Sequence, residues 1–121
     1  MDNRRVLVLG ASLKPERYAN RAIKLLKHFD YEVEAIGNRA GRVEDVEIKK
    51  DTKDVSDIHT VTIYLSPRNQ EPYYDFIKNL SPARVIFNPG TENDVFEDEL
   101  EKENVEVVEN CTLVMLNYDM F

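Results

Sequence analysis

The sequence predicts a single α/β domain in which a doubly wound parallel sheet is covered by helices on both faces. The chain has 121 residues, which suits one domain with a hydrophobic core of its own. Residues 6–9 form a continuous apolar run, which is typical of a strand buried on both faces. Similar runs alternate with segments of helical periodicity, and this order favours parallel strands joined by right-handed crossovers.

The first half of the chain predicts one complete strand–helix–strand unit. Residues 6–9 are the first strand, and apolar residues then recur with helical spacing over residues 19–29. Residues 33–36 follow as the second strand. After them the pattern weakens, and the alternation of apolar and charged residues at 46–48 indicates only a short edge strand.

The second half continues the alternation. Residues 61–65 predict a buried strand, and a helix is expected over 72–80 because Pro72 suits the first helical turn. Residues 85–87 predict a further buried strand that leads into the turn 88–90.

The last part of the chain predicts one helix, one strand and a docked tail. Thr91 and Asp94 are expected to form the N-cap and a partial capping box of the helix, whose many acidic residues are expected on a solvated face. Residues 105–108 predict the last strand, and the apolar tail 111–121 is expected to pack on the body of the domain.

Composition excludes several classes of function. The net charge of −7 argues against a general nucleic-acid surface. Cys111 is the only cysteine, so no internal disulfide can form, and two histidines offer no zinc-ligand spacing, so no metal is expected. No apolar stretch is long enough to cross a membrane and no signal peptide is visible, so a cytoplasmic location is expected.

The fold class also predicts where a ligand would bind. In a three-layer Rossmann-like doubly wound parallel sheet, ligands bind beyond the carboxyl ends of the strands where the winding reverses. This rule selects four loops: residues 10–15, 37–39, 66–69 and 88–90. We expect them to converge on one crevice.

The first of these loops favours a phosphate. Of the three glycines in the dinucleotide fingerprint G-x-G-x-x-G, the chain retains only Gly10. Gly10 still permits a tight turn, and Ala11 and Ser12 can offer backbone N–H groups and a hydroxyl close to a helix N-terminus. The alternative is that many strand–helix turns begin with glycine without binding anything.

The second loop argues against plain NAD. An acidic residue usually follows the second strand of an NAD site and binds the ribose 2′-hydroxyl, whereas this chain has Asn38 and Arg39 there. Arginine suits an additional ribose phosphate, which NADP carries at the 2′ position and coenzyme A (CoA) at the 3′ position. A solvated surface arginine is the alternative.

The opening segment carries a family resemblance. Residues 8–12 (Val-Leu-Gly-Ala-Ser), followed by 14–18 (Lys-Pro-Glu-Arg-Tyr) and 19–22 (Ala-Asn-Arg-Ala), resemble the start of the small bacterial CoA-binding domain proteins. These are relatives of the nucleotide domain of the succinyl-CoA synthetase alpha subunit. The similar landmarks later in the chain are Asn38, Pro67, residues 88–90, Asn93 and residues 107–111.

The resemblance implies a position for each part of CoA. It places the diphosphate over residues 10–12, the adenosine end near Asn38 and Arg39, and the pantetheine arm past Pro67. The chain departs from the family at Arg39, where proline is common, and in the loop that follows to Val46.

Three further residues complete the candidate site. Tyr18 and Arg21 lie one helical turn apart at the mouth of the phosphate loop, and Lys14 could supply a charge to the diphosphate. Packing and solvation are the alternative roles. The candidate ligand-binding residues are therefore Gly10, Ala11, Ser12, Lys14, Pro15, Tyr18, Arg21, Asn38, Arg39, Pro67, Pro89 and Gly90.

No catalytic arrangement is visible in the sequence. His28, His59 and Cys111 are expected to be structural, and no nucleophile and base share a motif. The leading hypothesis is non-catalytic binding of coenzyme A or an acyl-CoA by a sensor, carrier or accessory module. The alternatives are a small NADP-binding oxidoreductase or redox partner, and an interaction domain without a working crevice. The expected partner is a small-molecule nucleotide, with no nucleic acid and no membrane, and a homodimer or protein partner is left open.

Overall fold

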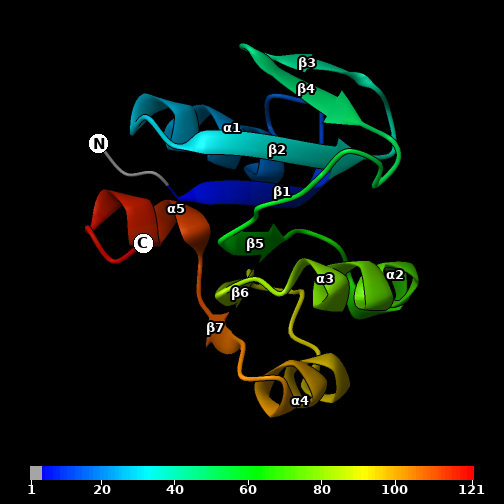
Figure 1. The fold of residues 1–121 in the computed structure, drawn as a ribbon. Helices are drawn as coiled ribbons and strands as arrows, with labels where there is room; N and C mark the ends of the chain where they lie inside the picture. Colours follow the sequence, from blue (N-terminus) through cyan, green and yellow to red (C-terminus); the bar gives the residue numbers. More distant parts are fainter. Residues whose placement is uncertain (1–3) are drawn as a thin grey trace.

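A computed structural model describes residues 4–121 and contains one seven-stranded sheet (Figure 1). The strands are β1 (Arg5–Ala11), β2 (Glu32–Gly37), β3 (Gly41–Val43), β4 (Val46–Lys49), β5 (Thr60–Ile63), β6 (Arg84–Phe87) and β7 (Glu106–Glu109). Their order across the sheet is β3-β4-β2-β1-β5-β6-β7. The chain therefore winds outward from β1 in one direction and then in the other, and the winding reverses between β1 and β5.

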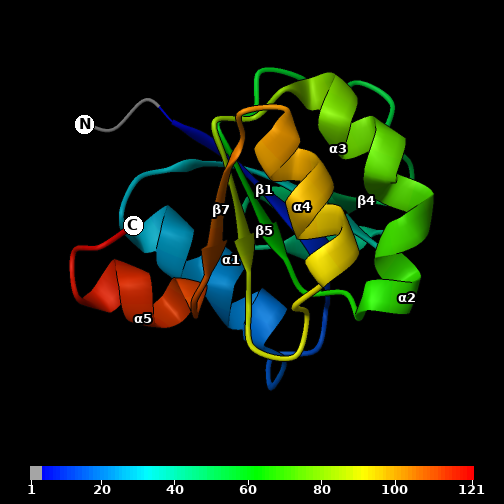
Figure 2. The same ribbon diagram turned by 90° about the horizontal axis from the view of Figure 1, so that it is seen from below.

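Helices cover both faces of the sheet (Figure 2). The helical segments are α1 (Tyr18–His28), α2 (Pro67–Gln70), the 3₁₀ turn η1 (Glu71–Tyr73), α3 (Tyr74–Leu80), α4 (Asp94–Lys102) and α5 (Thr112–Asn117). Ile23 and Leu26 of α1 and Leu116 of α5 pack on one face, and Ile77 of α3 and Phe96 of α4 pack on the other. The predicted single-domain, three-layer, doubly wound fold is confirmed.

The central strands are parallel and buried. β1 pairs in parallel with β2 and β5, and all four residues of β5 and of β6 are buried. The continuous apolar run of β1 therefore marks a buried strand correctly, whereas β5 alternates threonine with apolar residues and ends at Ile63, earlier than predicted.

One edge of the sheet differs from the prediction. β3, which was not predicted, runs antiparallel to β4, so the sheet is mostly rather than wholly parallel. Three residues with an exposed Arg42 in the middle give too short a pattern to recognise as a strand. β3 and β4 form a hairpin, so β3 rather than a helix connects β2 to the neighbouring strand β4.

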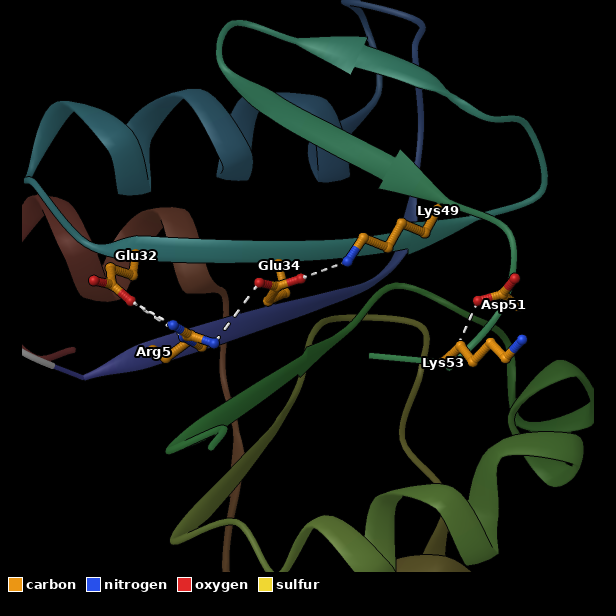
Figure 3. A network of polar contacts seen from close by, with 6 residues as sticks. All are labelled: Arg5, Glu32, Glu34, Lys49, Asp51 and Lys53. Atoms are coloured by element: carbon orange, nitrogen blue, oxygen red, sulfur yellow. Dashed lines mark hydrogen bonds and ion pairs between the residues drawn. The ribbon is translucent and has the colours of Figure 1, made fainter. Parts of the chain in front are cut away.

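A coil segment and a row of charges complete the sheet face on the α3 side. Val55 and Ile58 of the coil between β4 and β5 are buried in the same core as α3 and α4. Beyond them, the Glu34 carboxylate forms ion pairs with Arg5 and Lys49, with nitrogen–oxygen distances of 3.9 and 3.4 Å (Figure 3). This row of alternating charges joins β1, β2 and β4 where no helix covers the sheet.

The start of α4 corrects the predicted cap. Asn93, not Thr91, is the N-cap, and its Oδ1 accepts the Phe96 N–H at 3.1 Å. Glu97, not Asp94, reaches back to accept the Asn93 N–H at 2.8 Å. The Thr91 hydroxyl instead donates to the Asn88 carbonyl, so Thr91 belongs to the preceding turn. Glu97 is consequently buried rather than on a solvated face, and burial raises its pKa.

Two other segments are more helical than predicted. The helix expected from Pro72 starts earlier, since α2 begins at Pro67 and Pro72 lies in η1. The tail packs on the body of the domain as expected, and it does so as helix α5 with Met115 and Leu116 buried. Within residues 4–121, no helix has the length and apolar character that crossing a membrane requires.

Candidate functional site

A cavity of about 940 Å³ opens at the carboxyl ends of β1 and β5, where the winding of the sheet reverses. In Figure 1 this is the end of the sheet toward which the arrowheads of β2 and β5 point. All four predicted loops line it, with residues from each of the segments 10–14, 37–39, 64–69 and 89–91. We call this cavity the cleft.

Two glycines let the strand ends at the cleft approach one another closely. Gly10 has a φ of 95°, and a Cβ added to it would lie 3.0 Å from the carbonyl carbon of Tyr64. A Cβ on Gly37 would lie only 2.2 Å from the carbonyl oxygen of Ala11. The ends of β1, β2 and β5 can therefore form a tight floor only with glycine at these positions.

The loop after β1 is held in place by its own hydrogen bonds. The Ser12 hydroxyl oxygen accepts the Lys14 N–H at 3.1 Å, and the buried Asn20 side chain donates to the Ser12 carbonyl at 2.9 Å. Asn20 belongs to α1, so the loop is tied to the helix that follows it. Its outer residues remain exposed beside the cleft.

The charge of the cleft is opposite to that of the chain. The chain carries 23 acidic and 16 basic residues, yet the charged residues that line the cleft are Lys14, Arg17 and Arg39. Within residues 4–121 no aspartate or glutamate lines it. The cleft is therefore suited to an anion.

The start of α1 adds to this positive character. Tyr18 and Ala19, its first two residues, line the cleft. Arg17 is the N-cap and no side chain caps the helix, nor does its first turn contain an acidic residue. By contrast, α4 is capped by Asn93 and carries Asp94 and Glu97 in its first turn. The N-terminal amides of α1 thus remain available to an anion.

The other half of the cleft carries no charge. It is lined by Tyr64, Leu65, Ser66, Asn69, Pro72, Tyr73, Pro89, Gly90 and Thr91. These residues come from the segments after β5 and β6. They offer amide, hydroxyl and backbone groups between apolar surfaces.

Asn88 fixes the loop at the end of β6. Its Nδ2 donates to the Thr62 hydroxyl at 2.7 Å and to the Ile63 carbonyl at 2.9 Å. Its Oδ1 accepts the Thr112 N–H at 2.8 Å. One buried side chain therefore joins the ends of β5 and β6 to α5, at the residue that directly precedes Pro89 and Gly90.

Gln70 fixes the loop at the end of β5 in the same way. Its Nε2 donates to the carbonyls of Leu65 and Thr91 at 2.9 and 2.7 Å. Its Oε1 accepts from Asn93 at 2.9 Å. The uncharged half of the cleft is consequently a preformed surface rather than a pair of loose loops.

Tyr64 is the titratable group most altered at the floor of the cleft. Burial raises the pKa of its phenol from 10.0 to about 12. Its hydroxyl is enclosed, and the neighbouring hydroxyls of Thr112 and Thr62 offset only part of the rise in pKa. The group therefore stays neutral at physiological pH.

The structure brings most of the predicted residues together. The residues that line the cleft are Gly10, Ala11, Ser12, Lys14, Tyr18, Asn38, Arg39, Pro89 and Gly90. Pro15, Pro67 and Arg21 are not among the lining residues. Arg21 instead stacks over the Tyr18 ring, 5.3 Å from its centroid, and lines a separate hollow beside α5.

Sequence reasoning missed Arg17, Asn69 and Tyr73, which also line the cleft. Arg17 lies two residues before the predicted helical segment 19–29, so its place next to the phosphate loop was a usable signal. Asn69 lies within a predicted loop. Tyr73 fits a helical apolar pattern, and nothing in the sequence distinguishes it from a core residue.

The match to known proteins covers nearly the whole chain. Residues 4–117 match the sequence profile of the family described as CoA binding domain. An uncharacterized protein of known crystal structure is 39% identical, with all of both chains aligned and a TM-score of 0.95. No curated protein matches the sequence.

Two more distant structures share the fold. The cell-free ID.343 protein from Thermus thermophilus is 21% identical, with a TM-score of 0.84 over 98% of this chain and 91% of that one. A hypothetical protein from Pyrococcus horikoshii OT3 is 22% identical, with a TM-score of 0.85 over 98% and 84% of the two chains.

Proposed function

Because the chain belongs to the CoA binding domain family, we propose that its cleft binds coenzyme A or an acyl-CoA without catalysing a reaction on it. The protein would then act as a sensor, carrier or accessory module. The observation that carries this proposal is the lining of the cleft, where Lys14, Arg17 and Arg39 are the charged groups in an otherwise acidic protein.

The two halves of the cleft match the two halves of the ligand. CoA joins an adenosine nucleotide with three phosphates to an uncharged pantetheine arm. We assign the diphosphate to the Gly10–Ser12 turn and the first amides of α1, with Lys14 and Arg17 beside it. Arg39 would then bind the 3′-phosphate, and the uncharged half would take the arm.

The amides of the pantetheine arm also find suitable partners. The side chains of Asn69 and Ser66 can exchange hydrogen bonds with them, while Pro72 and Tyr73 offer apolar contact. Beyond the diphosphate, NADP would instead place a second ribose and a nicotinamide ring in this half, and the oxidised ring carries a positive charge for which the described lining of the half offers no carboxylate. The division of the lining therefore favours CoA over NADP.

Binding is favoured over catalysis by the residue types present. Among described residues, the cleft lining contains no histidine, cysteine, aspartate or glutamate, which are the usual acids, bases and nucleophiles. Tyr64 has a raised pKa that keeps it protonated. A bound acyl-CoA would thus be held rather than cleaved.

Calorimetric titration with CoA, dephospho-CoA, acetyl-CoA, NADP and NAD at one ionic strength tests the proposal. We expect CoA or acetyl-CoA to bind at micromolar affinity or tighter, and NAD to give no measurable heat. Comparing CoA with acetyl-CoA then shows whether an acyl group is tolerated. The proposal would be overturned if neither CoA nor acetyl-CoA gave measurable heat, or if NADP bound more tightly than CoA.

Arg39→Ala tests the assignment of the 3′-phosphate. The loss of a charge-assisted hydrogen bond should weaken CoA about tenfold to a hundredfold and leave dephospho-CoA nearly unchanged. Arg42→Ala is the matched control, because Arg42 is an exposed arginine three residues away that does not line the cleft. Equal losses for both ligands would remove Arg39 from the 3′-phosphate site.

A further inference from the structure

A second hollow, of about 340 Å³, lies between α1 and α5. It is lined by Arg21, Lys24, Leu25, His28, Leu113 and Asn117. Its ionisable side chains come from α1 and are all of the basic type, and its apolar side chains are two leucines. We call this hollow the groove.

Several large apolar side chains are exposed on α5, just after it, and at the end of α1, the two helices that form the groove. Phe29, Val114, Tyr118 and Met120 are all exposed, and Tyr118 is 72% exposed. Phe29 follows α1 directly, and the other three lie on α5 or just after it. Exposed apolar side chains on the elements that border a hollow are compatible with a protein-binding surface.

The opposite face of the sheet carries a helix of complementary character. α4 contains five acidic residues and a single lysine, whereas α1 contains one arginine, two lysines and His28 and no acidic residue. Among the exposed residues of α4 is Val95, which is 67% exposed and has the exposed Asp94 and Asp98 nearby on the same helix. α1 and α4 lie on different faces of the sheet, so the molecule is electrically polar across its layers (Figure 2).

We propose that the groove receives helix α4 of a second copy of this chain. Val95 would contact Leu25 and Leu113, while Asp94 and Asp98 would meet the basic wall of the groove. The two acidic residues are four positions apart, and Arg21 and Lys24 are three positions apart, so both helices present neighbouring charges on one side. This inference does not depend on the ligand of the cleft.

The geometry of such a contact has a consequence for assembly. The groove and α4 are different surfaces, so each copy in a pair keeps one surface unused. Association would therefore continue beyond a dimer or close into a ring. Because the chain has a net charge of −7, the attraction must come from the local charges and should weaken with added salt.

Sedimentation velocity of the whole protein, over increasing concentration at low and high salt, is the first test. We expect species larger than a dimer at low salt and high concentration, and monomer at high salt. A protein that stays monomeric at every concentration overturns the proposal.

Two variants then identify the surfaces. The groove variant carries Arg21→Glu with Lys24→Glu, and the helix variant carries Val95→Lys with Asp98→Lys; all four side chains are exposed. Each variant alone should be monomeric. An equimolar mixture should form a one-to-one dimer and nothing larger, because each variant retains the surface that the other lacks.

Net charge is controlled by a third variant. Lys50→Glu with Lys53→Glu changes two exposed lysines away from both surfaces, and it takes the net charge from −7 to −11, as the groove variant does. This control should still associate. If it is monomeric, or if the mixture of the groove and helix variants stays monomeric, α4 is not the occupant of the groove.

Discussion

At the scale of single residues, Gly10 determines both the shape of the cleft and part of the stability of the fold. Gly10 has a φ of 95°, which side chains rarely adopt, and a Cβ added to it would lie 3.0 Å from the Tyr64 carbonyl carbon. A side chain at this position would strain the backbone and press on the residue that directly follows β5.

We therefore predict that Gly10→Ala lowers the free energy of unfolding by about 2–4 kcal/mol. Gly90→Ala is the control, since Gly90 has a similar φ of 92° but nothing lies within 4 Å of an added Cβ. It should show only the backbone strain, about 1–2 kcal/mol. Urea unfolding measures the free energy of unfolding of both variants. If Gly10→Ala and Gly90→Ala lower it equally, the contact of the added Cβ with Tyr64 does not destabilise the fold.

Tyr64 makes the fold sensitive to alkaline pH. Its pKa is about 12 in the folded protein and near 10.0 when exposed, so the folded state holds the proton more tightly. The resulting stabilisation is complete below pH 10 and is lost as the pH rises toward 12, by on the order of 2–3 kcal/mol.

Urea unfolding at intervals between pH 9 and pH 12 tests this sensitivity. Tyr64→Phe should lose less stability over this range than the unaltered protein. Tyr118→Phe, which changes a tyrosine that is 72% exposed, should follow the unaltered protein. If the curves of Tyr64→Phe and the unaltered protein run parallel, the phenol is not protected from solvent.

At the scale of elements, α4 depends on Asn93 for two separate reasons. Its Oδ1 caps the helix, and its Nδ2 donates to Gln70 and to the Tyr74 hydroxyl at 2.9 and 2.7 Å. Asn93→Ala should lower the free energy of unfolding by about 2–4 kcal/mol, because it removes the cap and leaves buried partners unsatisfied.

Asn93→Ser separates the two contributions. The serine hydroxyl can still cap α4 but cannot reach Gln70 and Tyr74, so this variant should recover about 1 kcal/mol relative to alanine. Thermal and urea unfolding give the comparison. No difference between serine and alanine would show that the cap contributes nothing.

The elements also show how far the sequence predicts the fold. Strands that are apolar on both faces, such as β1 and β6, are visible because every residue of the run is buried. β3 is not visible, since hydrogen bonds to β4 rather than apolar side chains define it. The cap predicted at Thr91 was wrong because threonine and asparagine both cap helices and two candidates stand two residues apart. Only the fold shows that the Thr91 hydroxyl already donates to the Asn88 carbonyl in the preceding turn.

At the scale of the whole molecule, the position of the candidate site was predictable and its exact lining was not. Topology alone puts the carboxyl ends of parallel strands at one edge, so the four loops could be named in advance. Whether a side chain faces the cleft depends on the path of each loop. Arg21 turns away to Tyr18, while Arg17, four residues earlier, faces the cleft.

The hydrogen bonds of Asn88 have a consequence for local motion. α5 has six residues, too few for a helix to persist alone in water, and a helix near the end of a chain would ordinarily fray. Here the N–H of its first residue, Thr112, donates to the side chain of the buried Asn88, which directly follows β6. The Thr112 amide should therefore exchange with deuterium only when the sheet itself opens, with the same opening free energy as amides of β5 and β6, so that the terminal helix and the floor of the cleft form one cooperative unit.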